Sequence, residues 1–287
     1  MGYNSVLGVT KMDYADLHIH TSASDGLLSP QEVVQWAQKK RLRAIGITDH
    51  DTISGINPAI ESNERPDKLE IIPGIELNTE YYGKEIHMLG YYIDYKDQWF
   101  LKILKRMQES RYNRAVTMIE KLNALGIDIE LKQVEEISKG SSIGRPHIAR
   151  AMVEKGYIDS MVDAFDKYIG VGCPAYVERF KLTTREAIEI IEKAGGISVL
   201  AHPGLINDKK SISSILSLGV KGIEVLHPKH DQDMVRYLLA LAKERKLFIT
   251  GGTDCHGIMQ NGQPIMGNIS IDYNKVIELK KYAGIEE

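Results

Sequence analysis

Residues 16–26 read Asp16-Leu17-His18-Ile19-His20-Thr21-Ser22-Ala23-Ser24-Asp25-Gly26. On an extended strand successive side chains point to opposite faces, so His18 and His20 project to one side while Leu17 and Ile19 face the core. The polar residues that follow indicate that the strand ends at the histidines, where Asp25 can return toward them. This pattern is typical of a metal site at a strand end, although paired histidines also occur as surface or hydrogen-bonded core residues.

The composition is that of an ordinary globular enzyme. The 287-residue chain is 43% hydrophobic and 26% charged. It has no apolar run near the ~20 residues that cross a bilayer. The first residues contain neither a basic leader nor a sustained apolar region, so we expect no secretory signal. Two cysteines, Cys173 and Cys255, provide no disulfide framework and suit a reducing compartment, which predicts a cytoplasmic location.

The charge distribution favours a small anionic substrate over long duplex DNA. The net charge of -3 lacks the basic excess that a duplex-binding surface needs. Residues 101–150 nevertheless contain ten Lys and Arg against six Asp and Glu. This local excess fits an anion-binding region, and it fits a solvated helical face equally well.

Strands and helices alternate over most of the chain, and polar residues mark the strand ends. Ser29-Pro30-Gln31-Glu32 predicts a helix start, with Ser29 as the cap and Glu32 completing a capping box. Apolar runs at 44–48, 69–77, 84–94, 197–201, 222–226 and 247–250 contain or precede His50, Glu76, His87, His202, His227 and Asp254 respectively. Such alternation predicts a parallel sheet, and in a β/α barrel the strand ends share one face.

A helical segment interrupts this alternation. Apolar residues recur every three or four positions from Gln98 to a stop at Gly126, and shorter helices are predicted at 131–138, 145–155 and 159–168. No convincing strand precedes Pro174. We therefore predict an α/β domain in two parts, residues 14–97 and 176–287, with a helical insertion at 98–175.

Six motifs together resemble the polymerase and histidinol phosphatase (PHP) family of metal-dependent phosphoesterases. They are D-L-H-I-H-T, I-T-D-H-D, P-G-I-E, the histidine of H-M-L-G, A-H-P and G-T-D-C-H, which lie in this order within residues 14–95 and 184–272. The resemblance implies a distorted (β/α)7 barrel that holds up to three metal ions at the carboxyl ends of its strands.

The resemblance also implies a ligand set. One ion would be held by His18, His20, Glu76 and Asp254; a second by bridging Glu76 with His87 and His202; and a third by Asp25, His50 and His256. Many relatives have histidine where this chain has Asp25, so the third site can differ in occupancy or metal preference. Imidazoles with carboxylates suit Mn, Fe or Zn better than Mg, so we expect two to three divalent ions, with Mn first among them.

The chemistry of such a centre needs no serine or cysteine nucleophile, because metal ions generate hydroxide and clamp phosphoryl oxygens. Glu76, Asp254 and His230 are the candidate catalytic residues. His230 is preferred over His227 as the proton donor, because His227 precedes Pro228 in an expected turn. Asp49 and Asp51 either orient the His50 imidazole or serve as cap and turn residues.

The insertion supplies the substrate hypothesis. Gly144-Arg145-Pro146-His147 begins a predicted helix, whose N-terminus favours anions. Similar segments occur in the PHP subgroup similar to nucleoside 3′,5′-bisphosphate phosphatases and short-RNA exonucleases, which implies that Arg145 grips a substrate phosphate. Arg179, His147 and His230 are further candidates for substrate binding. Arg179 can equally be an exposed salt-bridging residue, and His147 a packing residue.

These observations predict a phosphoesterase that hydrolyses a phosphate monoester, converting a nucleoside 3′,5′-bisphosphate to the 5′-mononucleotide or acting on short oligonucleotides. One alternative is a histidinol-phosphate phosphatase, although the long insertion fits the nucleotide-acting subgroup better. The other is a PHP module that only binds metal or a regulatory partner, which loss of ligands would support. None is lost. We expect no membrane and no long duplex DNA as partners.

Overall fold

Short apolar runs form the strands of one curved sheet. The computed structural model describes residues 14–138, 143–178, 182–206 and 208–285. The strand order is β1 (Tyr14–Ile19), β2 (Ala44–Ile47), β3 (Glu70–Tyr81), β4 (Lys84–Tyr91), β6 (Ile197–Leu200), β7 (Gly222–Leu226) and β8 (Phe248–Gly251). Two-residue strands β11 (Ile271–Asp272) and β5 (Leu182–Thr183) pair with β1 and β3. A separate two-stranded sheet is formed by β9 (Met259–Gln260) and β10 (Gln263–Pro264).

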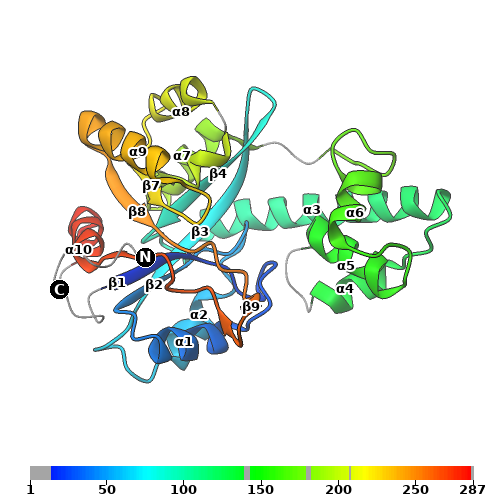
Figure 1. Ribbon diagram of the computed structural model, residues 1–287, viewed down its shortest axis with the longest axis horizontal. Helices are drawn as coiled ribbons and strands as arrows, with labels where there is room; N and C mark the ends of the chain where they lie inside the picture. Colours follow the sequence, from blue (N-terminus) through cyan, green and yellow to red (C-terminus); the bar gives the residue numbers. More distant parts are fainter. Residues whose placement is uncertain (1–13, 139–142, 179–181, 207, 286–287) are drawn as a thin grey trace.

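The chain after β8 returns to β1 and closes the sheet. The N–H of His20 donates to the carbonyl of Cys255 at 3.0 Å, and the N–H of Cys255 donates to the carbonyl of His18 at 3.3 Å. Seven strands therefore form a barrel, with helices packed around it (Figure 1). The predicted fold class, a distorted (β/α)7 barrel with a helical insertion, is confirmed.

One strand runs against the expected direction. β4 is antiparallel to both of its neighbours, β3 and β6. The turn between β3 and β4 consists of Tyr82 and Gly83, whose φ angles are 47° and 79°. A two-residue turn of this kind reverses the chain and leaves no room for a crossover helix. The expectation of a parallel sheet is wrong here, and His87 reaches the barrel interior from the middle of β4.

Six helices cover the barrel. They are α1 (Pro30–Lys39), α2 (Ile56–Ser62), α7 (Thr184–Lys193), α8 (Lys209–Leu216), α9 (Gln232–Arg245) and α10 (Tyr273–Tyr282). The capping box predicted for α1 is present, because Ser29 accepts from the N–H of Glu32 and the Glu32 carboxylate accepts from the N–H of Ser29. Within the described ranges no helix is both long enough and apolar enough to cross a membrane.

The insertion is built on one long helix. α3 (Gln98–Ala124) extends away from the barrel and is joined by α4 (Leu131–Ser138), α5 (Arg145–Glu154) and α6 (Met161–Ala164) (Figure 1). A π-helical turn at Phe165–Ile169 follows α6, so the helix expected over 159–168 changes its geometry at Phe165.

The two ends of α3 belong to different hydrophobic cores. Phe100, Leu104 and Met107 pack into the barrel core. Met118 and Leu122 pack instead into a separate core shared with α4, α5 and the π-helical turn. The predicted boundary between 97 and 98 therefore stays a prediction, since α3 contributes to the barrel as well as to the insertion.

A buried carboxylate, Asp16, ties the closing segment to β1. Its oxygens accept from the backbone N–H of Thr253 at 2.9 Å, from the Thr253 hydroxyl at 2.6 Å and from the N–H of Gly267 at 2.8 Å. The neighbouring Gly252 permits this approach, because a Cβ there would lie 2.4 Å from the backbone nitrogen of His18. The Asp16 carboxylate and the missing side chain at Gly252 thus support the backbone hydrogen bonds that close the barrel.

We expect Asp16→Asn to lower the free energy of unfolding by about 2 kcal/mol, because an NH2 group would face donors and leave a buried N–H unsatisfied. Urea unfolding of the purified protein measures this change. Asp67→Asn is the control, since Asp67 is exposed. Equal stability of the two variants would show that Asp16 does not hold the barrel closed.

Candidate active site

Four of the predicted ligands meet where β1, β3 and the segment after β8 converge. Nε2 of His18 lies 3.3 Å from Oε2 of Glu76, and Nε2 of His20 lies 3.2 Å from the same oxygen. Oδ1 of Asp254 lies 3.4 Å from His18 and 3.1 Å from His20. Both histidines are fully buried, because their side chains lie within the closed barrel. This is the group predicted for the first ion.

The second oxygen of Glu76 faces a different pair of imidazoles. Oε1 lies 2.9 Å from Nδ1 of His87 and 3.0 Å from Nε2 of His202. His50 also approaches, with its Nδ1 3.1 Å from Oε2. The compact group that can hold an ion here is His50, Glu76 and His87. Bridging by Glu76 fits this arrangement, while His202 as the second imidazole ligand of this ion stays a prediction.

The third predicted group also comes together. Nε2 of His256 lies 3.4 Å from Oδ1 of Asp25, and Nε2 of His50 lies 4.0 Å from Oδ2. Nδ1 of His20 lies 3.9 Å from Asp25, so this ring has one nitrogen toward each of two groups. The sequence analysis predicted Asp25, His50 and His256 for this group. It did not predict that Nδ1 of His20 would also face it.

Unpartnered atoms test whether this cluster suits a cation. Of seven buried side-chain nitrogen and oxygen atoms without a hydrogen bond in the described residues, five lie here. They are Nε2 of His18, both ring nitrogens of His20, Oε2 of Glu76 and Nε2 of His227. Buried polar atoms are normally paired. The N–H of Lys229 donates to Nδ1 of His227, so in the neutral ring the proton is on Nε2. The lone pairs of His18, His20 and Glu76 that converge without partners fit a divalent ion, and the imidazole and carboxylate set suits Mn, Fe or Zn.

The electrostatics lead to the same conclusion. Burial disfavours charge on His20, but the Asp254 and Glu76 carboxylates outweigh it and raise the pKa of His20 to about 10. Burial likewise opposes ionisation of Glu76, yet the surrounding imidazoles, His50 first, hold its pKa well below the usual range. The carboxylates therefore stay ionised and require a neighbouring positive charge, which either protons or a metal ion can provide.

Buried polar side chains shape the loops that carry these ligands. Asp49 accepts from the N–H and hydroxyl of Thr21 and from the hydroxyl of Ser24, so it fixes the loop before Asp25. Asp49 is therefore a loop residue. Asp51 accepts from the N–H and the amide group of Asn78.

Asn78 links Asp51 to the histidine and carboxylate cluster. Its amide nitrogen lies 3.2 Å from Nδ1 of His50, so Asp51 acts on that imidazole only through Asn78. Glu224 is a second polar group of this kind that the sequence reasoning missed. Oε1 of Glu224 lies 3.0 Å from Nδ1 of His18. The available signal was a carboxylate inside an apolar strand, the same signal that singled out Glu76.

The two histidines after β7 differ in what their rings contact. Nδ1 of His230 donates to the carbonyl of Val225 at 2.9 Å, which leaves Nε2 to accept from the N–H of Gly204 at 3.0 Å. His227 instead lies with Nε2 3.5 Å from Oδ2 of Asp254 and has no hydrogen bond there. The structure thus places His227, and not the preferred His230, toward the cluster.

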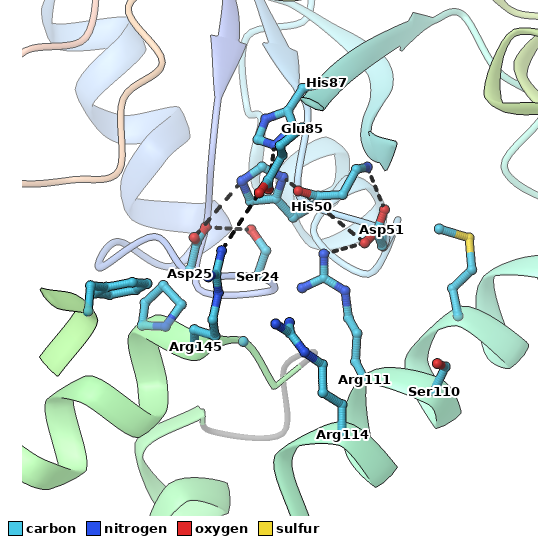
Figure 2. A pocket seen from close by; sticks show the side chains of 15 residues that line it. Ser24, Asp25, His50, Asp51, Glu85, His87, Ser110, Arg111, Arg114 and Arg145 are labelled. Atoms are coloured by element: carbon cyan, nitrogen blue, oxygen red, sulfur yellow. Dashed lines mark hydrogen bonds and ion pairs between the residues drawn. The ribbon is translucent and has the colours of Figure 1, made fainter. Parts of the chain in front are cut away.

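A cleft lies between the barrel and the insertion. Figure 2 shows Arg111, Arg114 and Arg145 extending from the insertion toward the ends of the barrel strands. Arg145 lies 3.7 Å from Glu85, and its guanidinium stacks 5.3 Å from the ring centre of Phe165. The cleft opens onto three of the predicted ligands, Asp25, His50 and His87.

The sequence predicted one of these arginines. Arg111, paired with Asp51, and Arg114 were missed, because charges on a long helix read as a solvated face. His147 is buried, and its Nδ1 accepts from the N–H of Gly144, so it caps α5 and does not line the cleft. Arg179 lies outside the described residues.

The closed barrel with histidines and carboxylates gathered at one end defines a barrel hydrolase of the metal-dependent class. Within that class the chain belongs to the PHP domain family, which matches residues 16–194. The resemblance read from the six motifs is confirmed, and the chain is a PHP phosphoesterase.

Three comparisons illustrate the relationship. The 5′-3′ exoribonuclease Rnm of Escherichia coli (strain K12) is 35% identical over 247 residues, which make up 84% of each chain. The 3′,5′-nucleoside bisphosphate phosphatase of Chromobacterium violaceum is 30% identical over 259 residues, covering 87% of this chain and 90% of that protein. A Bifidobacterium adolescentis protein, provisionally described as a metal-dependent phosphoesterase, superposes with a TM-score of 0.83 at 29% identity, covering 93% and 95% of the two chains.

Glu76→Gln tests the metal assignment. The amide removes the charge that five imidazoles share, so we expect Mn2+ affinity to fall by more than about 100-fold. This loss exceeds the one expected when a residue that only hydrogen-bonds to a metal ligand is removed. Metal analysis after loading and desalting measures the bound ion. Glu64→Gln, at an exposed position, is the control. Equal metal content in both variants would contradict the assignment.

Proposed function

We propose that the chain hydrolyses a phosphate monoester on a nucleotide that carries a second phosphate, or on short oligonucleotides. The main observation is the cleft in which Arg111, Arg114 and Arg145 face the histidine and carboxylate cluster. Guanidinium groups bind phosphate oxygens in fixed geometry. A substrate with one phosphate at the cluster and another at the arginines would satisfy both ends of this cleft.

The proposed cofactors are two to three divalent ions, with Mn first and Fe or Zn as alternatives. His18, His20, Asp25, His50, Glu76, His87, His202, Asp254 and His256 would hold them. Such ions supply Lewis acidity and make hydroxide available near neutral pH. Glu76 and Asp254 contribute by fixing the negative charge around which the imidazoles are arranged.

The relatives support the nucleotide assignment. Two of them are named for action on RNA and on nucleoside bisphosphates, and each matches more than four fifths of this chain. A histidinol-phosphate phosphatase remains the alternative substrate assignment. The non-catalytic module is disfavoured, because all nine proposed ligands are present. The cytoplasmic location stays a prediction.

The proton for the leaving oxygen comes in this proposal from His227. Its Nε2 has no hydrogen-bond partner and lies toward Asp254, whereas both ring nitrogens of His230 are engaged by backbone groups. Hydrolysis then transfers one proton to the departing alkoxide as water adds to phosphorus. His230 becomes a structural residue that ties β7 to the segment after β6.

The two histidines give opposite expected phenotypes. His227→Gln should lower kcat by about 100-fold, because proton transfer is lost while the fold is kept. His230→Gln should lower stability by about 1 kcal/mol, since at least one backbone hydrogen bond is lost. Steady-state kinetics and thermal melting on both variants separate these effects. A larger loss of kcat in His230→Gln than in His227→Gln would show that His230 is the proton donor.

Arg145→Ala tests the anion site. Loss of a charge-assisted contact should raise KM for adenosine 3′,5′-bisphosphate by about 10-fold or more and leave kcat nearly unchanged. Phosphate release with Mn2+ from this substrate, AMP, histidinol phosphate and a short RNA measures the preference. Lys105→Ala, an exposed cation on α3, is the control. Preference for histidinol phosphate, or an unchanged KM, would overturn the nucleotide assignment.

A further inference from the structure

Glu224 is a fully buried carboxylate that the proposed reaction does not use. It lies in the middle of β7, between Ile223 and Val225, and none of its surface is exposed. Burying an ionised carboxylate is unfavourable unless hydrogen-bond donors surround it. Both oxygens of Glu224 have such donors, one from β1 and one from the segment after β6.

One oxygen faces His18 on β1. Nδ1 of His18 lies 3.0 Å from Oε1 of Glu224. An ionised carboxylate only accepts, so Nδ1 carries the proton of this contact. In the neutral ring the lone pair then lies on Nε2, which is the atom that approaches Glu76 and Asp254.

The other oxygen holds the backbone of His202 after β6. The N–H of His202 donates to Oε2 of Glu224 at 2.7 Å. His202 has a φ of +26°, in a range that residues with side chains rarely adopt. A strained conformation persists only where the surroundings enforce it. Here the hydrogen bond to Glu224 contributes to that enforcement and places the His202 ring 3.0 Å from Glu76.

We propose that Glu224 is a positioning residue for the metal centre, which fixes the tautomer of His18 and the backbone of His202 with one carboxylate. The inference rests on the proposed function and adds to it a group outside the ligand set. Partners of this kind around metal-binding histidines typically change metal affinity by 10- to 100-fold when they are removed.

Glu224→Gln separates this role from simple packing, because the shape is kept and one acceptor becomes a donor. If the amide oxygen stays with the N–H of His202, the NH2 faces Nδ1 of His18. The ring must then carry its proton on Nε2, where it blocks the metal. If the amide is reversed, two donors face each other at His202. Either orientation disturbs one ligand.

The experiment titrates the metal-free wild type, Glu224→Gln and Thr250→Val with Co2+ and follows the visible absorption of the bound ion. Thr250 lies opposite Glu224 in the β7–β8 register and is equally buried, so its variant perturbs the same layer of the barrel. We expect Glu224→Gln to bind Co2+ about 10- to 100-fold more weakly and Thr250→Val to bind like the wild type. Circular dichroism of the metal-free proteins verifies that all are folded.

Glu224→Asp is a second variant that keeps two acceptor oxygens at shorter reach, and its Co2+ affinity should lie between those of the wild type and Glu224→Gln. Equal affinity of Glu224→Gln and wild type overturns the inference and leaves the proposed function standing. An equal loss in Thr250→Val also overturns it, because the effect would then be general. Failure of the wild type to bind Co2+ or Mn2+ would overturn the proposed function itself.

Discussion

The buried charge on Glu76 is what allows so many imidazoles to lie together. Five histidine rings, from β1, β4 and the segments after β2 and β6, each place a nitrogen within 3.3 Å of one of its two oxygens. Without a carboxylate between them, these rings would present lone pairs or protons to one another in a region of low dielectric. Closure of the barrel by Cys255 and reversal of the chain at Gly83 bring the rings to this charge.

Much of this arrangement could be predicted, because parallel strands end on one face and polar residues at their ends must therefore meet. His18, His50 and Asp254 are of this type. The direction of β4 was missed because an alternating chain favours crossover connections, and only the short turn at Tyr82 contradicts them. Glu224 was missed although it is an acidic residue in an apolar strand, as Glu76 is, because no family motif includes it and its partners, His18 and His202, are distant in sequence.

The cleft was less predictable than the histidine and carboxylate cluster. Its residues come from elements whose relative positions the sequence does not fix. Arg111 and Arg114 share a face of α3, but nothing local shows that this face lies opposite the barrel. The choice between His227 and His230 depends on a turn, in which the N–H of His230 donates to the carbonyl of His227. That turn was expected at Pro228, but which ring faces inward is decided by the contacts of Val225 and Gly204.

Because α3 packs into two cores, it fixes a distance within the cleft. Met107 packs in the barrel core, and Arg111 follows one helical turn later on the same face, in the cleft. The distance from the histidine and carboxylate cluster to Arg111 and Arg114 is thus set by the packing of α3 inside the barrel, whereas Arg145 is placed by the separate core of the insertion. In the proposed reaction, a substrate would fit when the spacing of its two phosphates matches this distance.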